Sequence, residues 1–182
     1  MAAALPSVAS PAAAAHLTVR LATERDVPAL IALINQLASE ARLLFVVPVD
    51  PETGAEDLRQ FLTMTAASGN NAVLVAAEGA KLLGLATATG GVHPAKRAAV
   101  EIGIGVLEAH QGCGVGAALM AGLEEWARSA GIHRLQLPVV TTNASAIALY
   151  RKCGFAVEGT LSESVRVDGR HVDQYMMAKL LA

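Results

Sequence analysis

A glycine-rich loop is the part of the 182-residue sequence whose residue types and spacing point most directly to chemistry. Residues 106–118 read VLEAHQGCGVGAA, with Gly112, Gly114 and Gly116 between a predicted strand and a predicted helix. Glycines let backbone N–H groups approach a ligand closely, and a helix N-terminus adds unpaired donors and a positive dipole. The loop therefore favours a pyrophosphate site without a basic side chain, although a plain strand-to-helix connection can carry the same glycines.

Two familiar phosphate-binding loops match this segment poorly. A P-loop ends in Gly-Lys-Ser/Thr, whereas this loop ends Gly116-Ala117-Ala118. A dinucleotide fingerprint fits the glycines, but it requires an acidic residue about 20 positions further on. The next strand ends Val140-Thr141-Thr142, and the loop lies more than halfway along the chain, which leaves too little room for a doubly wound sheet. An NAD-dependent oxidoreductase is therefore a disfavoured alternative.

The apolar pattern predicts one α/β domain over residues 16–182, after an Ala/Ser/Pro-rich lead-in at 1–15 that we expect to be disordered. Its sheet is mixed and mostly antiparallel, with one strand–helix–strand crossover, and about four helices flank it. We expect Asp26 to cap the first helix, and Thr53 with Glu56 to form a capping box at the second. The expected strands are 16–22, 72–78, 82–89, 98–107, 134–140, 155–162 with a continuation at 165–167, and 172–180, and the expected helices are 26–38, 53–67, 116–130 and 144–152.

Composition argues against several classes of function. Lys+Arg 14 against Asp+Glu 16 gives a formal net charge of -2, and aromatic residues make up 3%, so no nucleic-acid footprint is expected. No apolar run reaches the ~18 residues of a membrane-spanning helix. The five histidines and the two cysteines, Cys113 and Cys153, lack ligand spacing, so we predict no metal site. Two cysteines without a disulfide framework fit a reducing cytoplasm.

Three segments together resemble the GCN5-related N-acetyltransferase family. Gln111–Gly116 matches the family's Gln/Arg-x-x-Gly-x-Gly/Ala loop, and the preceding strand, AAVEIGIGV, has the family's character. Asn143–Tyr150, followed by Gly154-Phe155, resembles the second family signature, in the usual order and at the usual separation. The resemblance covers about Leu17–Leu180 and implies a single acetyltransferase domain with acetyl-CoA as co-substrate.

The resemblance also implies direct attack of an acceptor amine on the thioester, without an acyl-enzyme. We expect a small, amino-acid-like amine, because the stretch 158–180 is similar to a bacterial branch that includes amino-acid N-acetyltransferases. A protein N-terminus or lysine is the second candidate, and a non-catalytic acetyl-CoA-binding module is the alternative from another class. We expect a homodimer, and no nucleic-acid or membrane partner. The acceptor pocket should draw on Asn35–Pro51, the loop around His93 and the hairpin near Asp168–Asp173.

Two residues are candidates for the chemistry. The resemblance places Tyr150 beside the thioester sulfur, where a phenol can protonate the departing thiolate, and a packed core-edge tyrosine is the alternative. Glu101 is the candidate base, acting through a water. Alternation puts it on one strand face with Gly103 and Gly105, which leaves open floor for an amine. A solvent-facing strand residue is the other interpretation of Glu101, and Glu108 or water alone are alternative bases.

Contacts with acetyl-CoA are likewise implied by the resemblance. Val106 would offer its backbone N–H to the thioester carbonyl, where its strand bulges and splays from its neighbour. Asn143 would contact the cofactor or hold the next loop, and as a helix N-cap it can do both. The expected cofactor-binding residues are Val106, Gln111, Gly112, Cys113, Gly114, Val115, Gly116, Ala117, Asn143 and Ala146.

Overall fold

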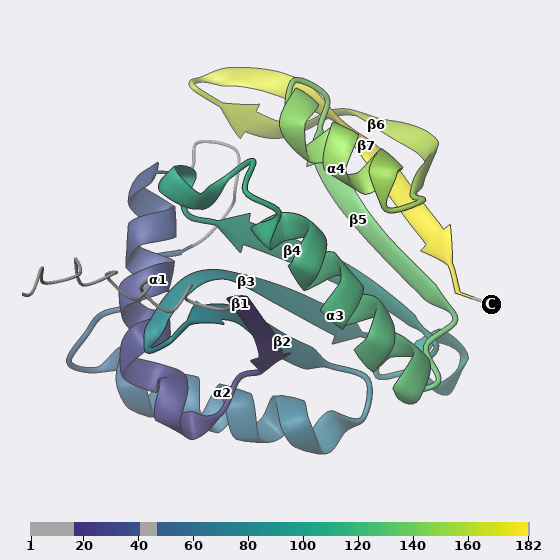
Figure 1. Ribbon diagram of the computed structural model, residues 1–182. Coiled ribbons are helices and arrows are strands. Elements are labelled where there is room, and N and C mark those ends of the chain that lie inside the picture. Colours follow the sequence, from purple (N-terminus) through teal and green to yellow (C-terminus); the bar gives the residue numbers. More distant parts are fainter. Residues whose placement is uncertain (1–16, 41–46, 182) are drawn as a thin grey trace, which may run out of the picture.

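Seven strands form one sheet in the computed structural model, which describes residues 17–40 and 47–181. The strand order is β1-β2-β3-β4-β5-β7-β6, and only the β4–β5 pair is parallel (Figure 1), as the predicted crossover requires. The expected lead-in at 1–15 and the expected strand start at His16 lie outside the described residues. The strands are β1 Leu17–Leu21, β2 Ala72–Glu78, β3 Lys81–Gly90, β4 Ala99–Val106, β5 Arg134–Val140, β6 Ala156–Val167 and β7 Arg170–Leu180.

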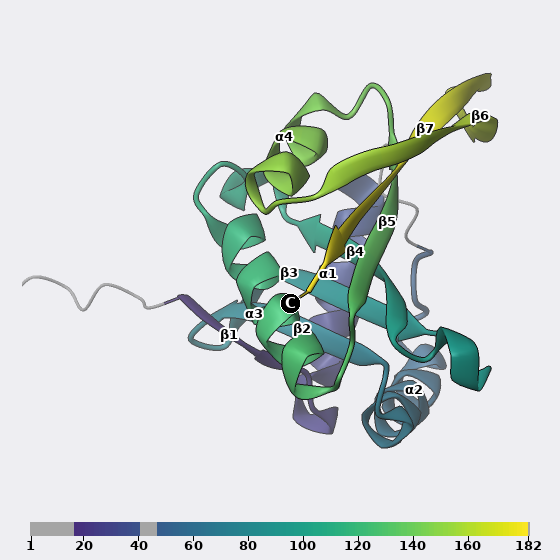
Figure 2. The ribbon, with the colours of Figure 1, turned by 90° about the vertical axis from the view of Figure 1, so that its right-hand side faces the viewer.

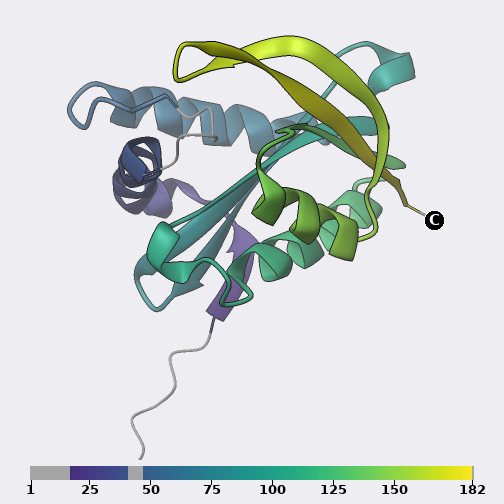
Figure 3. The same ribbon diagram turned by 90° about the horizontal axis from the view of Figure 1, so that it is seen from above.

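Helices cover both faces of this sheet, with α1 and α2 on one face and α3 and α4 on the other (Figure 3). Each face has its own buried cluster, because side chains alternate along a strand. In β2, Val73 and Val75 join the cluster under α1 and α2, whereas Leu74 and Ala76 join the cluster under α3. The helices are α1 Val27–Glu40, α2 Gly54–Ser68, α3 Val115–Ser129 and α4 Ala144–Lys152.

The predicted bounds of β2, β5 and α4 agree with the structure, but the C-terminal pattern was misleading. The two runs expected at 155–162 and 165–167 belong to one strand, β6. Its register with β7 shifts between Leu161 and Val165, and Glu163 in between has a φ of 49°. This irregularity interrupts the alternation of side chains, so a continuous strand reads as two.

The caps of the first two helices also differ from the predictions. Thr23 is the N-cap of a 3-10 turn, Glu24–Asp26, that leads directly into α1. The Asp26 carboxylate bonds back to this residue, accepting the Thr23 N–H at 2.8 Å and its hydroxyl at 3.0 Å. No capping box forms at α2, because the Thr53 side chain makes no cap hydrogen bond. The Asp50 carboxylate instead binds the turn before α2, where it accepts the N–H groups of Glu52 and Thr53 at 2.8 and 2.9 Å.

The parallel ladder between β4 and β5 is short, and the two strands diverge beyond it (Figure 1, Figure 2). It pairs residues 99–101 with residues 134–136 and then ends. The Thr141 N–H donates to the Asp173 carbonyl of β7, whereas the Arg134 N–H donates to the Ala98 carbonyl on the β4 side. Backbone N–H groups along a strand point alternately to its two neighbours. Pro138 lies four residues after Arg134, so its nitrogen also points toward β4. Proline has no N–H to donate, so the ladder cannot continue through this position.

Asp26→Asn tests the ion pair that holds the start of α1. Two guanidinium nitrogens of Arg20 lie 2.7 Å from the Asp26 carboxylate, and this hydrogen bonding lowers the pKa of Asp26 from 3.8 to about 2. Since the folded pKa is the lower one, the stabilisation is present above pH ~4 and is lost as the pH falls toward 2. We expect the variant to lose about 1 to 2 kcal/mol of unfolding free energy at pH 7, measured by urea titration.

The matched control is Glu56→Gln, which removes the exposed carboxylate that pairs with Arg59 and should change stability little. The deficit of Asp26→Asn should shrink as the pH is lowered from 4 to 3. An equal deficit at pH 7 and pH 3 would contradict the role of the charged carboxylate.

Candidate active site

The glycine loop forms an exposed backbone cradle between β4 and α3. After β4 a short 3-10 turn spans Glu108–His110, and α3 begins at Val115, one residue before the expected Gly116. Gly112 and Gly114 have φ values of 73° and 89°, a conformation that favours glycine. No heavy atom beyond their chain neighbours lies within 4 Å of a Cβ built on either glycine. The loop backbone is therefore open to a ligand, and a side chain at these positions would obstruct it.

The first turn of α3 adds N–H donors to this cradle. Hydrogen bonding of the turn begins with the Ala118 N–H and the Gly114 carbonyl at 3.0 Å, so the N–H groups of Val115, Gly116 and Ala117 have no acceptor within the helix. Combined with the helix dipole, these donors suit an anion such as pyrophosphate. The fold thus brings the predicted loop residues and helix start together at one point.

Two side chains hold the loop in place. Gln111 Nε2 donates to the Val106 carbonyl at 3.0 Å and ties the loop to the end of β4. The Glu40 carboxylate, at the end of α1, accepts the Glu108 N–H at 2.9 Å, and this bond lowers the pKa of Glu40. Glu40 was not predicted from the sequence. The cradle is therefore connected to the C-terminal end of α1.

Val106 lies where β4 has lost its β5 partner. Leu107 N–H donates to the Leu83 carbonyl at 3.0 Å, so antiparallel alternation turns the N–H groups of Val106 and Ile104 away from β3 and toward the gap. The expected splay is therefore present. The expected bulge in β4 is wrong, because its register with β3 runs without a shift from Val100 to Val106. A shift occurs instead on the other side of β3, where Leu83 is the extra residue opposite β2.

Tyr150 lies in α4 with its ring buried against Phe155, at a centroid distance of 6.0 Å. Burial raises the pKa of Tyr150 to about 12, so the phenol stays protonated at neutral pH. Within the described residues its hydroxyl makes no hydrogen bond, and no buried side-chain oxygen there lacks a partner, so the hydroxyl reaches solvent. These properties suit a general acid, and that role stays a prediction.

The helix that carries Tyr150 packs beside the cradle. A Cβ on Gly116 would lie 3.0 Å from Leu149 Cδ2 and 3.9 Å from Val106 Cγ2, so α4, the start of α3 and the end of β4 meet there. Asn143 caps α4, and its side-chain oxygen accepts the Ala146 N–H at 3.2 Å. The capping role of Asn143 is confirmed, whereas cofactor contacts of Asn143 and Ala146 stay predictions.

Glu101 is exposed at the other end of β4, in the last residue pair of the β4–β5 ladder. It lies five residues from Val106, about 17 Å along a strand. One acetyl group therefore cannot touch the Val106 N–H and the Glu101 carboxylate together, and a base at Glu101 must act through water. Glu108, the alternative base, lies close to Val106 and shares a small polar hollow with Glu40 and Gln111. Both assignments stay predictions.

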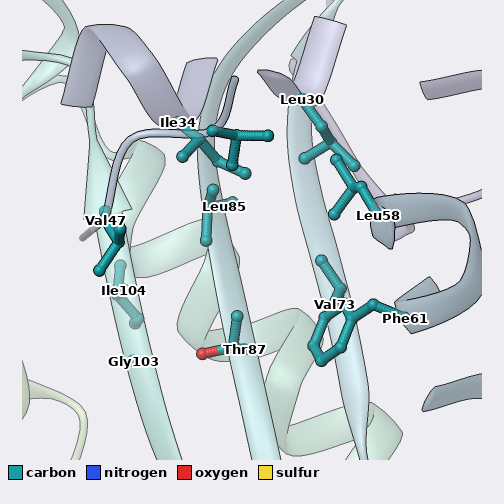
Figure 4. Close-up of a pocket in the computed structure, with 12 residues that line it drawn as sticks. Leu30, Ile34, Val47, Leu58, Phe61, Val73, Leu85, Thr87, Gly103 and Ile104 are labelled. Atoms are coloured by element: carbon teal, nitrogen blue, oxygen red, sulfur yellow. The ribbon is translucent and has the colours of Figure 1, made fainter. Parts of the chain in front are cut away.

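A cavity of about 340 Å³ lies between the sheet and the helices α1 and α2 (Figure 4). Ile34 of α1 and Leu58 and Phe61 of α2 face Leu85 and Thr87 of β3 across it. Its floor includes Gly103, Ile104 and Gly105 of β4, so it adjoins the strand that borders the gap.

The sequence located this pocket only in part. Val47 and Val49, from the expected segment 35–51, line it, whereas the loop at His93 and the hairpin 168–173 do not. The contribution of α2 was missed. Its signal was the pair Phe61 and Met64, which leave 51% and 65% of their surface exposed on an otherwise amphipathic helix.

The two cysteines and the histidines add no further site. Cys113 is exposed in the loop, and Cys153 is half-buried against the core, where burial raises the pKa of its thiol. Over residues 17–40 and 47–181, no three His, Cys, Asp or Glu side chains gather in a way that could hold a metal ion. Within the same part of the chain, no helix is long and apolar enough to cross a membrane.

A backbone cradle for phosphates, an open strand edge leading away from it and a neutral phenol define a site for group transfer from a long, phosphate-anchored carrier. The profile of the acetyltransferase (GNAT) family matches residues 34–155. The L-methionine sulfoximine/L-methionine sulfone acetyltransferase of Pseudomonas aeruginosa is 29% identical over 164 residues, which cover 88% of this chain and 92% of that protein.

Solved structures agree with this match. A GNAT-family acetyltransferase from Streptococcus pneumoniae superposes with a TM-score of 0.84 and 29% identity, covering 92% of this chain and 100% of that one. A putative acetyltransferase from Salmonella typhimurium, solved with its cofactor acetyl-CoA, gives 0.80 and 26% identity, covering 91% and 94%. The chain belongs to the GNAT family of acetyltransferases, and the predicted family, fold and enzyme class are confirmed.

The raised pKa of Tyr150 predicts how stability changes in alkali. A phenol with a pKa near 10 when unfolded and about 12 when folded contributes stability that is present below pH 10 and is lost as the pH rises toward 12. Tyr150→Phe lacks this loss. Between pH 10 and pH 11, we expect the parent protein to lose about 1 kcal/mol more unfolding free energy than the variant, measured by urea titration. Parallel pH curves for the two proteins would show that the phenol ionises as easily folded as unfolded.

Proposed function

We propose that this protein transfers the acetyl group of acetyl-CoA directly to the primary amine of a small, amino-acid-like acceptor. The observation that carries the proposal is the meeting of the phosphate cradle, the β4–β5 gap and the apolar pocket along β4. The acceptors for which the Pseudomonas relative is named, methionine sulfoximine and methionine sulfone, are amino-acid derivatives and support the acceptor class. A protein N-terminus or lysine is the second candidate for the acceptor.

The residues present fit coenzyme A. The pyrophosphate would accept hydrogen bonds from the loop Gln111–Gly114 and from Val115, Gly116 and Ala117, where glycines leave the backbone open. The amide-containing arm of coenzyme A would then enter the gap between β4 and β5. There it would pair with the N–H groups of Val106 and Ile104, which have no β5 partner. An arm laid along β4 supplies the missing strand, and it carries the thioester toward the pocket.

The chemistry needs little beyond position and two proton transfers. The neutral acceptor nitrogen attacks the acetyl carbon, a C–N bond forms and the C–S bond breaks. Tyr150 donates its phenolic proton to the departing sulfur and regains one from water. The excess proton on nitrogen passes to water and on to Glu101 or Glu108. Each positioned acid or base is worth about 10²–10⁴ in rate.

The pocket favours a small acceptor over a protein segment, because about 340 Å³ lies near the lower end of the ligand-pocket range. We further propose that the protein works in the cytoplasm and as a homodimer. Free thiols at Cys113 and Cys153 are compatible with the reducing compartment. Gel filtration with light scattering tests the assembly.

Gly114→Val tests the cradle, because a branched side chain at a φ of 89° obstructs the backbone donors. Acetyl-CoA at a concentration of one hundred times its Kd should stabilise the folded parent by ~2.7 kcal/mol and so raise its Tm. NAD should leave the Tm unchanged. In the variant we expect the Kd for acetyl-CoA to rise at least about tenfold, measured by calorimetry.

The control is Gly131→Val, after the other end of α3. Gly131 has a φ of 70° and equally open surroundings, so this variant carries the same backbone strain away from the cradle. Equal losses of acetyl-CoA affinity in both variants, or a thermal shift of the parent with NAD alone, would refute the assigned site.

Tyr150→Phe tests the general acid, since it removes one hydroxyl and keeps the buried ring. We expect kcat to fall about 10²-fold or more at neutral pH with little change in KM for acetyl-CoA. The loss should be smaller with an acyl donor whose thiol has a low pKa and leaves without a proton. Equal losses with both donors would mean that Tyr150 shapes the site and donates no proton.

A further inference from the structure

The pocket next to the gap is apolar on both of its walls. Ile34, Leu58 and Phe61 supply the helical wall, and Val73 and Leu85 contribute to the sheet wall (Figure 4). Among the lining residues in the described part of the chain, Thr87 carries the single polar side chain. None of these described lining residues carries a charged side chain that could pair with a charged group.

The floor has a gradient of polarity along β3 and β4. Two cross-strand residue pairs of β3 and β4 line the cavity. The next pair along the strands lies outside the cavity lining and contains the carboxylate of Glu101. In order from the apolar end, the pairs are Leu85 with Gly105, Thr87 with Gly103, and Thr89 with Glu101.

A charged acceptor body is disfavoured by this arrangement in two ways. Burying a charge without a partner costs several kcal/mol, and these walls offer none. An anionic body also meets the like charge of Glu101 at the outer end of the floor. An apolar body gains free energy with each methylene that leaves water.

We infer that the pocket selects primary amines whose body is apolar and uncharged and has about the size of a leucine, methionine or norleucine side chain. The inference rests on the proposed transferase function and narrows its acceptor class. This preference would separate the chain from its Pseudomonas relative, which is named for acceptors that carry an oxidised, polar sulfur. This chain should prefer methionine itself to methionine sulfone.

A matched acceptor series tests the class with the unmodified protein. Along 2-aminobutyrate, norvaline and norleucine, kcat/KM should rise about fourfold per methylene. Methionine should exceed methionine sulfone, and glutamate and lysine should fall at least about 100-fold below norleucine. Thiol release with mass analysis of the product measures each value.

Two variants on one helix locate the selectivity. Phe61→Arg places a cation on the pocket wall at a half-exposed position, where folding tolerates it. It should lower kcat/KM for norleucine and raise it for glutamate, each about tenfold. Met64→Arg makes the same change one turn further on, at a residue outside the lining, and should leave the norleucine-to-glutamate ratio within about twofold.

The outcomes separate this inference from the proposed function. A parent preference for glutamate, lysine or methionine sulfone over norleucine overturns the apolar class and leaves the transferase intact. If no amine is acetylated although acetyl-CoA binds, the proposed function fails. Calorimetry of norleucine with the coenzyme A complex then tests whether the pocket still binds an apolar amine. Binding weakened by Phe61→Arg but not by Met64→Arg supports the apolar class, and absence of binding overturns it.

Discussion

The structure depends on a parallel ladder that stops after three residue pairs. Pro138 faces β4 without an N–H, so the two central strands separate just beyond Glu101 and Gln136. The other neighbouring strands of the sheet pair in antiparallel fashion, with register shifts in the β2–β3 and β6–β7 pairs. The separation of β4 from β5 leaves backbone donors of β4 facing a space into which an extended ligand can fit as an additional strand. Pro138 ends the ladder because it has no backbone N–H to donate, so no particular side-chain interaction is needed to separate β4 from β5.

The crossover places both helices of the cofactor side at the open end of this gap. α3 starts immediately after the loop that follows β4, so its N-terminus lies at the end from which β4 diverges. α4 follows β5 and packs on α3 through Leu149 and Gly116, which puts Tyr150 close to the same opening. The proposed anion binding, strand pairing and proton donation would therefore come from three consecutive pieces of chain, whereas α1 and α2 line the pocket on the opposite face.

Much of this arrangement could be predicted because it is local. The cradle needs only glycines between a strand and a helix, and the α4 bounds follow from Asn143 and the nine residues behind it. The errors come from contacts between distant residues. Arg20 and Thr23 both bind the Asp26 carboxylate. Asp50 binds the turn in front of α2, where the Thr53 side chain makes no cap hydrogen bond. The bulge expected in β4 was inferred from the family resemblance and not from a pattern of residues. Pro138, which ends the β4–β5 ladder, was by contrast visible in the sequence. The pocket wall on α2 depends on which helix face meets the sheet, and helical periodicity alone does not reveal the neighbour.

The two buried clusters on opposite faces of the sheet share no residue. Substitutions in sites that are well separated and have no common partner change stability and binding almost independently. A lineage could therefore replace Phe61, Leu58 or Ile34, and so change the acceptor, without altering the helix and loop that hold the donor. The sheet would then separate a half that binds the donor from a half that binds the acceptor. Divergence of acceptor preference under a constant donor is the evolutionary behaviour that such a partition permits.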